Sequence, residues 1–212
     1  MADLVEQLIA SKYLKAPHLI KAFKKIKRED FVLPGAKEEA GLNVPLNIGF
    51  GQTISQPLTV AFMLELLEPR KTEKVLDIGS GSGWVSALLT EIVGESGRVY
   101  AIERIEELKS FGEQNTEKYR FVSDGRLKFF VGDGAKGLPE YAPFDVIHVA
   151  ASAATIPSAL LDQLAIGGRL IIPEGVDTQE LVLIERKSEN EYTQRRFSGF
   201  VFVPLISKTI NR

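Results

Sequence analysis

The stretch VLDIGSGSG, residues 75–83, decides the fold, because it joins a short apolar run to a turn with glycines at alternate positions. A strand that ends near an acid and leads through such a turn into an apolar helix is typical of nucleotide-binding α/β proteins. Gly79 and Gly81 allow the backbone to turn tightly, and the free N–H groups of the following helix face the same point. The sequence therefore predicts a ligand site at this turn.

The glycine spacing distinguishes between two kinds of nucleotide ligand. A dinucleotide fingerprint, G-x-G-x-x-G, needs a third glycine at position 84, where this chain has Trp84. Asp77 stands two residues before the first glycine and would repel a pyrophosphate. S-adenosylmethionine suits the site better, because its sulfonium and amino groups are cationic and its one carboxylate can lie at the helix N-terminus. A glycine-rich turn that binds nothing is the alternative.

Two further acids stand where predicted strands end, at the sheet edge that binds ligands in open α/β folds. Glu103 can accept hydrogen bonds from both ribose hydroxyls, or it can belong to the start of the helix that begins near Ile105. Asp133, in Gly132-Asp133-Gly134, can accept from the exocyclic amine of adenine, or it can form an ordinary Asp-Gly turn. Together with Asp77, three acids at three consecutive strand ends favour a cofactor site.

Strand and helix signals alternate through the middle of the chain, which predicts right-handed crossovers on a parallel, doubly wound sheet. We expect strands near 74–79, 98–103, 127–131, 144–150 and 168–173, and helices near 84–93, 106–118 and 155–165. Two later runs, 180–186 and 196–203, predict an antiparallel pair that closes the sheet edge, joined by the polar segment 187–194.

The N-terminal part predicts two amphipathic helices, followed by a long irregular stretch from Leu33 to Gly51 that is rich in glycine, proline and asparagine. We expect the helices and this loop to lie over the carboxyl edge of the sheet, since such loops are usually functional. The chain then reads as a single α/β domain over 1–212, with the helices and substrate loop in 1–70, the cofactor-binding core in 71–175 and the C-terminal strands in 176–212.

Composition limits the partners. The 212 residues are 44% hydrophobic and carry a net charge of −2 without a long run of either sign, so no nucleic acid or membrane partner is expected. No stretch approaches the roughly 18 apolar residues of a membrane span. Residues 1–13 lack the pattern of a secretory signal. With no cysteine and two histidines, no metal site is expected.

Five further runs carry a resemblance: NIGFGQTISQP at 47–57, GDG at 132–134, APFD at 142–145, LDQL at 161–164 and FVPL at 202–205. Over nearly the whole chain they resemble the protein-L-isoaspartate O-methyltransferases, which have a Rossmann-like methyltransferase fold. The resemblance implies a monomeric cytoplasmic enzyme that uses S-adenosylmethionine. It implies methylation of the free α-carboxylate of isoaspartyl residues in damaged proteins and peptides, whose ester then collapses to a succinimide that reopens partly to aspartate.

The matching positions imply Ser55 as the active-site serine, with Thr53 and Ile54 beside it in the isoaspartyl pocket. An alternative role for Ser55 is the N-cap of the helix that begins near Pro57. The expected cofactor-binding residues are Gln52, Asp77, Gly79, Ser80, Gly81, Glu103, Asp133 and Gly134.

Three positions depart from the pattern of the family. Leu58 replaces a histidine that often follows the proline, Asn43 ends a Gly-Leu-Asn run in place of Tyr-x-Asp, and Glu174 replaces a small apolar residue. These departures keep open a homologue that binds the cofactor with weakened catalysis. A small-molecule O-methyltransferase is the other alternative, because it would share the cofactor half of the chain.

Overall fold

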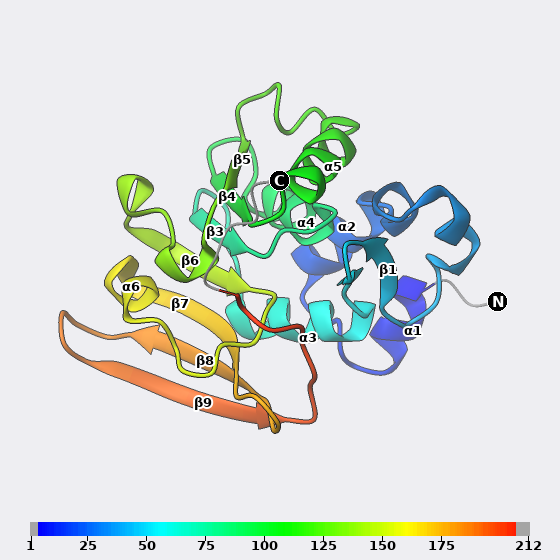
Figure 1. Cartoon of the computed structure of the whole chain (residues 1–212). Coiled ribbons are helices and arrows are strands. Elements are labelled where there is room, and N and C mark those ends of the chain that lie inside the picture. Colours follow the sequence, from blue (N-terminus) through cyan, green and yellow to red (C-terminus); the bar gives the residue numbers. More distant parts are fainter. Residues whose placement is uncertain (1–3, 207–212) are drawn as a thin grey trace.

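The computed structural model describes residues 4–206, whose centre is a seven-stranded sheet with the order β5-β4-β3-β6-β7-β8-β9 (Figure 1). Residues 1–3 and 207–212 of the expected domain lie outside this range. Neighbouring strands from β5 to β7 are parallel, whereas β8 and β9 are antiparallel to their neighbours. The predicted sheet, mostly parallel with an antiparallel C-terminal pair, is confirmed. The strands are β3 Lys74–Ile78, β4 Arg98–Glu103, β5 Leu127–Val131, β6 Phe144–Val149, β7 Leu164–Glu174, β8 Glu180–Arg186 and β9 Tyr192–Ser198.

Helices cover both faces of the sheet, which is why its central strands are continuous apolar runs. On one face lie α3 Pro57–Leu67, α4 Trp84–Val93 and α5 Glu106–Glu117, whose buried side chains join those of the sheet in one core. The other face carries α6 Ser158–Asp162 and the 3₁₀ turns η3 Gly134–Lys136 and η4 Pro139–Tyr141, over a second core. No helix within residues 4–206 is long and apolar enough to cross a membrane.

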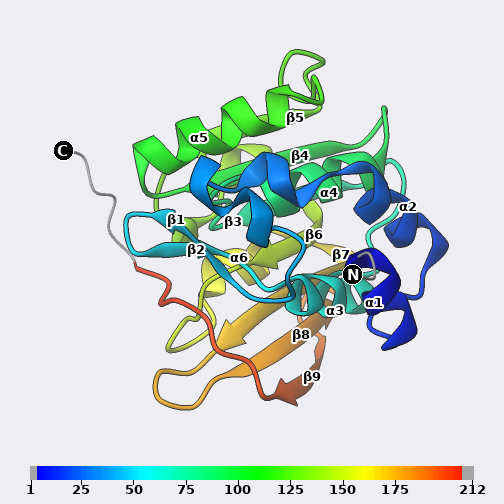
Figure 2. The same cartoon turned by 90° about the vertical axis from the view of Figure 1, so that its right-hand side faces the viewer.

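The N-terminal segment adds an outer layer and then reaches the sheet edge. Helices α1 Leu4–Ala10 and α2 Pro17–Lys25 pack against α3 and α4. After the 3₁₀ turns η1 Arg28–Phe31 and η2 Pro34–Glu39, the antiparallel hairpin β1 Leu46–Gly49 and β2 Gln52–Ile54 extends past the carboxyl ends of the strands (Figure 2). The stretch 33–51, expected to be irregular, thus contains η2 and the first strand of a hairpin.

The predicted bounds of the last parallel strand and of the last antiparallel strand are wrong. Strand β7 begins at Leu164, which pairs with Phe144, and this shortens the expected helix 155–165 to α6. The last strand, β9, covers 192–198 in place of 196–203. Its polar residues are compatible with an edge strand, because β9 pairs with β8 alone and exposes most of its side chains.

Residues 199–203, expected in the last strand, instead leave the sheet. The segment after β9 returns across the carboxyl edge of the sheet, drawn in red in Figure 2. Ser152 fixes it there, since its N–H donates to Val203 O at 2.7 Å and its carbonyl accepts from Leu205 N at 2.7 Å. The hairpin and this returning segment therefore flank the same edge.

Candidate active site

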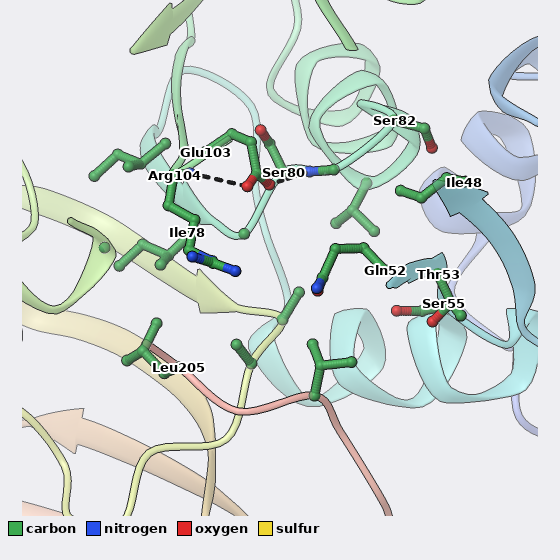
Figure 3. A pocket seen from close by; sticks show the side chains of 18 of the residues that line it. Ile48, Gln52, Thr53, Ser55, Ile78, Ser80, Ser82, Glu103, Arg104 and Leu205 are labelled. Atoms are coloured by element: carbon green, nitrogen blue, oxygen red, sulfur yellow. Dashed lines mark hydrogen bonds between the residues drawn. The ribbon is translucent and has the colours of Figure 1, made fainter. Parts of the chain in front are cut away.

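A cleft opens at the carboxyl ends of the central strands, where three segments distant in sequence meet (Figure 3). The glycine turn and the end of β4 form one wall, the hairpin β1–β2 forms another, and the returning segment 203–206 closes the third side. The lining includes nine of the eleven site residues predicted from the sequence, namely Gln52, Thr53, Ile54, Ser55, Gly79, Ser80, Gly81, Glu103 and Gly134.

The glycine turn has the left-handed backbone that its sequence predicts. Gly79, Gly81 and Gly83 have φ values of +78°, +51° and +86°. A side chain at Gly81 would also place its Cβ 3.1 Å from Cδ1 of Ile48, on the opposite wall. Glycine at this position therefore keeps the cleft open as well as allowing the turn.

The carboxylate of Glu103 links this turn to the end of β4. Its Oε2 accepts from Gly81 N at 3.0 Å, and its Oε1 accepts from Arg104 N at 2.9 Å and Ile105 N at 3.1 Å. Glu103 is 6% exposed, and burial raises its pKa against the opposing effect of these hydrogen bonds. A carboxylate has about four acceptor positions, so Oε2 retains one for a ligand hydroxyl.

Asp77 does not line the cleft, although it lies at the end of β3. Its carboxylate is buried behind the glycine turn, where Oδ2 accepts from Ser86 Oγ at 2.5 Å and Oδ1 lies 2.8 Å from Nδ1 of His148. Ser86 belongs to the first turn of α4, so Asp77 holds that helix against β6. The structure thus places it among supporting residues and not at the ligand surface.

Asp133 is the other predicted residue outside the lining. Its Oδ1 accepts from Ala135 N at 3.0 Å, which makes it the cap of η3, as in the Asp-Gly turn considered from the sequence. The neighbouring Gly134 does line the cleft, and a Cβ there would lie 2.4 Å from Cγ2 of Ile78. The backbone at this strand end is therefore packed against the wall of the site.

Ser55 lies where the first cleft meets a second one. The second cleft is lined by residues of the hairpin, α3 and the segment after β9, and shares Thr53, Ser55, Ala150 and Val203 with the first. Within residues 4–206, the Oγ of Ser55 has no hydrogen-bond partner. A ligand that fills the first cleft and one that lies in the second would therefore meet beside this hydroxyl.

The helix-cap alternative for Ser55 is wrong. Helix α3 begins at Pro57 with Gln56 in the N-cap position, and the side chain of Gln56 makes no capping hydrogen bond to the helix. Asn43 has this role instead, because its Oδ1 accepts from Leu58 N at 2.9 Å and its carbonyl accepts from Gln56 Nε2 at 3.0 Å. Two of the departures noted in the sequence, Asn43 and Leu58, thus form one contact that ties the loop to α3.

The third departure, Glu174, is also paired. Its Oε2 lies 2.7 Å from Nη2 of Arg196, and its Oε1 accepts from Ile156 N at 3.3 Å. Glu174 lines neither cleft, so its charge is not directed at a ligand.

Sequence reasoning missed several residues of the lining. Arg104 follows Glu103 and extends its side chain along the wall below it (Figure 3). Ile48 contributes from the hairpin and Ile206 from the returning segment. The resemblance at 202–205 was the one signal for this last segment, since no local pattern predicts that it returns to the site.

Comparisons with known proteins all identify the same family. The family model "Protein-L-isoaspartate(D-aspartate) O-methyltransferase" matches residues 1–210. A protein-L-isoaspartate O-methyltransferase of Aeropyrum pernix is 46% identical over 97% of this chain and 78% of its own length. One of Methanopyrus kandleri is 44% identical over 97% of this chain and 90% of its own.

A solved structure shows the same fold. It is described as a protein-L-isoaspartate O-methyltransferase of Plasmodium falciparum in complex with S-adenosyl-L-homocysteine. It superposes with a TM-score of 0.88 at 26% identity, over 97% of each chain. The similarity therefore includes the hairpin and the C-terminal segment as well as the sheet.

Proposed function

The chain belongs to the protein-L-isoaspartate(D-aspartate) O-methyltransferase family, and on this premise we propose that it methylates the α-carboxylate of isoaspartyl residues in proteins and peptides. The methyl donor is S-adenosylmethionine. The observation that carries the proposal is the position of Ser55, at the junction of two clefts that can hold the donor and the peptide.

We propose the first cleft as the site of S-adenosylmethionine. When bound, S-adenosylmethionine supplies a methyl group on a cationic sulfur, which an ionised oxygen can take without a general base. We assign Glu103 to the ribose, because its Oε2 retains acceptor capacity at the end of β4. Gly79, Ser80 and Gly81 offer a backbone surface free of bulky side chains, and Gln52 faces them from the hairpin.

Asp77 and Asp133 support this site without lining it. We assign Asp77 to the position of α4 relative to β6, through Ser86 and His148. We assign Asp133 to the turn that presents Gly134 to the cleft. For these two residues the proposed role is thus indirect, in contrast to the direct cofactor contact expected from the sequence.

We propose that the second cleft holds the isoaspartyl peptide. A peptide carboxylate titrates near about 3.3 to 4, so it is already ionised at neutral pH. The protein needs to orient it and exclude water, and such positioning can be worth roughly 7 to 11 kcal/mol. Ser55 Oγ donates a hydrogen bond to the carboxylate, Thr53 lines both clefts beside it, and Ile54 shapes the junction from the side of the first cleft.

We further propose a monomer in the cytoplasm without a nucleic acid partner. The net charge of −2 with interspersed signs supports the last point. We also propose the division of labour expected from the sequence, with the substrate loop in 1–70, the cofactor core in 71–175 and the C-terminal strands in 176–212. The first cleft is lined by residues of all three parts, which supports a single functional unit.

The proposed function is tested with two peptides that differ only in one linkage. Methyl transfer from labelled S-adenosylmethionine to an isoaspartyl peptide is compared with transfer to its aspartyl twin. We expect label in the isoaspartyl peptide alone. Equal labelling of both, or label in neither from a protein that binds the donor, would contradict the assignment.

A further inference from the structure

Arg28 is a buried cation that gathers the backbone of the loop in front of the active site. Arg28 is the first residue of η1 and is 5% exposed. Nη1 donates to Ala40 O and Leu42 O, each at 3.1 Å. Nη2 donates to Val44 O at 2.8 Å and to Ser55 O at 3.2 Å. One guanidinium therefore joins residues 40–44 of the loop to Ser55, the residue proposed to contact substrate.

These partners do not neutralise the charge. All four acceptors are backbone carbonyl oxygens, which carry only partial charges. Burial lowers the pKa of Arg28 to about 10, which leaves the guanidinium charged at pH 7 with part of its desolvation cost uncompensated. The planar guanidinium of arginine can donate to several carbonyl groups at once, whereas the ammonium of a lysine presents its donors from a single point.

Two further contacts extend the arrangement on either side. Asn43, between the carbonyls that Arg28 holds, accepts from Gln56 and Leu58 at the start of α3. On the other side, Cζ of Arg28 lies 5.4 Å from the ring centroid of Trp84, a residue of the cofactor cleft wall. The loop, Ser55 and the cleft wall thus share one anchor.

We infer that Arg28 is a positioning residue for methyl transfer, which holds the backbone of Ser55 so that its Oγ faces the junction of the two clefts. This inference rests on the proposed function of that junction. Arg28 contacts neither the donor cleft nor the peptide cleft directly, because it lines neither of them. Its effect passes through the loop and Ser55.

The test uses Arg28→Lys, which keeps the charge and loses the planar guanidinium. We expect kcat/KM for an isoaspartyl peptide to fall about 10- to 150-fold, the range for losing a hydrogen bond to a charged group. The Kd for S-adenosylmethionine should rise by a smaller factor than kcat/KM falls, because Glu103 and the glycine turn lie outside residues 40–55. Amide hydrogen exchange should become faster in residues 40–55.

The matched control is Arg169→Lys. Arg169 is also a buried arginine, and it donates to Glu68 O and pairs with Glu73. Both partners precede β3 in the chain, and none of the three residues lines either cleft. Arg169→Lys should lose stability without loss of kcat/KM and without faster exchange in 40–55. If the two variants lose kcat/KM equally, Arg28 has only a general structural role and the inference is overturned.

Further outcomes keep this inference separate from the proposed function. A wild-type protein that ignores the isoaspartyl peptide refutes the function, whereas unchanged exchange of 40–55 in Arg28→Lys refutes the anchor whatever the activity. If Arg28→Lys does not fold, Arg28→Ala is measured with added guanidinium ion. Recovery of kcat/KM by guanidinium and not by ammonium supports the inference, and equal or no recovery overturns it.

Discussion

Replacing the hydroxyl of Ser55 should separate catalysis from stability. A hydrogen bond to a charged group is worth about 1.5–3 kcal/mol. At about 1.4 kcal/mol per factor of ten, Ser55→Ala should lower kcat/KM for an isoaspartyl peptide about 10- to 150-fold. The free energy of unfolding should change by less than about 0.5 kcal/mol, because Oγ has no partner within residues 4–206 and Ser55 does not cap α3.

Ser55→Asp sharpens the same prediction. A second carboxylate at the junction would face the substrate carboxylate in a water-poor site, so turnover should fall further than in Ser55→Ala. Steady-state kinetics at saturating S-adenosylmethionine, with denaturant unfolding of each variant, measures both effects. Thr59→Val is the control, because it removes a hydroxyl from the second cleft without touching the first. Near wild-type turnover in Ser55→Asp would refute the role of this hydroxyl.

Three further outcomes follow from the groups around the cofactor cleft. Glu103→Ala should weaken S-adenosylmethionine binding by about 1.5–3 kcal/mol with little change in peptide KM, and unaltered affinity by calorimetry would leave Glu103 a structural role only. Burial raises the pKa of Glu103, and ligand hydroxyls donate to its ionised form. The affinity for S-adenosylmethionine should therefore be highest above that pKa and fall as the pH drops through it. A Glu103→Gln variant with the same pH profile of affinity would contradict this. Asp77→Ala should lower the free energy of unfolding by about 2–5 kcal/mol, since it leaves Ser86 Oγ and His148 Nδ1 buried without their partner, and a loss below about 0.5 kcal/mol in denaturant unfolding would argue against its supporting role.

The central strands were predictable because both of their faces are buried. Strand β6 is a buried run of this kind, β4 and β5 have the bounds expected from the sequence, and the glycine turn after β3 has the positive φ values that its composition requires. Strand β9, at one edge of the sheet, carries no such signal, since its exposed polar residues resemble those of a loop. Strand β2 has only three residues and so forms no readable pattern.

Residue type and spacing were enough to place the site at the carboxyl ends of the strands, but not to assign the role of each acidic residue there. Glu103 and Asp77 both follow apolar runs of the sheet, yet one carboxylate lines the cleft and the other is buried behind it. The direction of the Asp77 carboxylate depends on Ser86 of α4 and His148 of β6, which lie far from it in the sequence. The cap of α3 was misassigned for a related reason, because Asn43 reaches it from across the loop.

The fate of the transferred methyl group tests the central claim most directly. An ester on the α-carboxylate of isoaspartate is expected to close to a succinimide with release of methanol, and then to reopen partly to the aspartyl peptide. A time course by mass spectrometry and chromatography of the isoaspartyl peptide with S-adenosylmethionine should therefore show a transient ester, then succinimide, then the aspartyl twin. A stable methyl adduct that never yields succinimide would place the methyl group elsewhere and contradict the account.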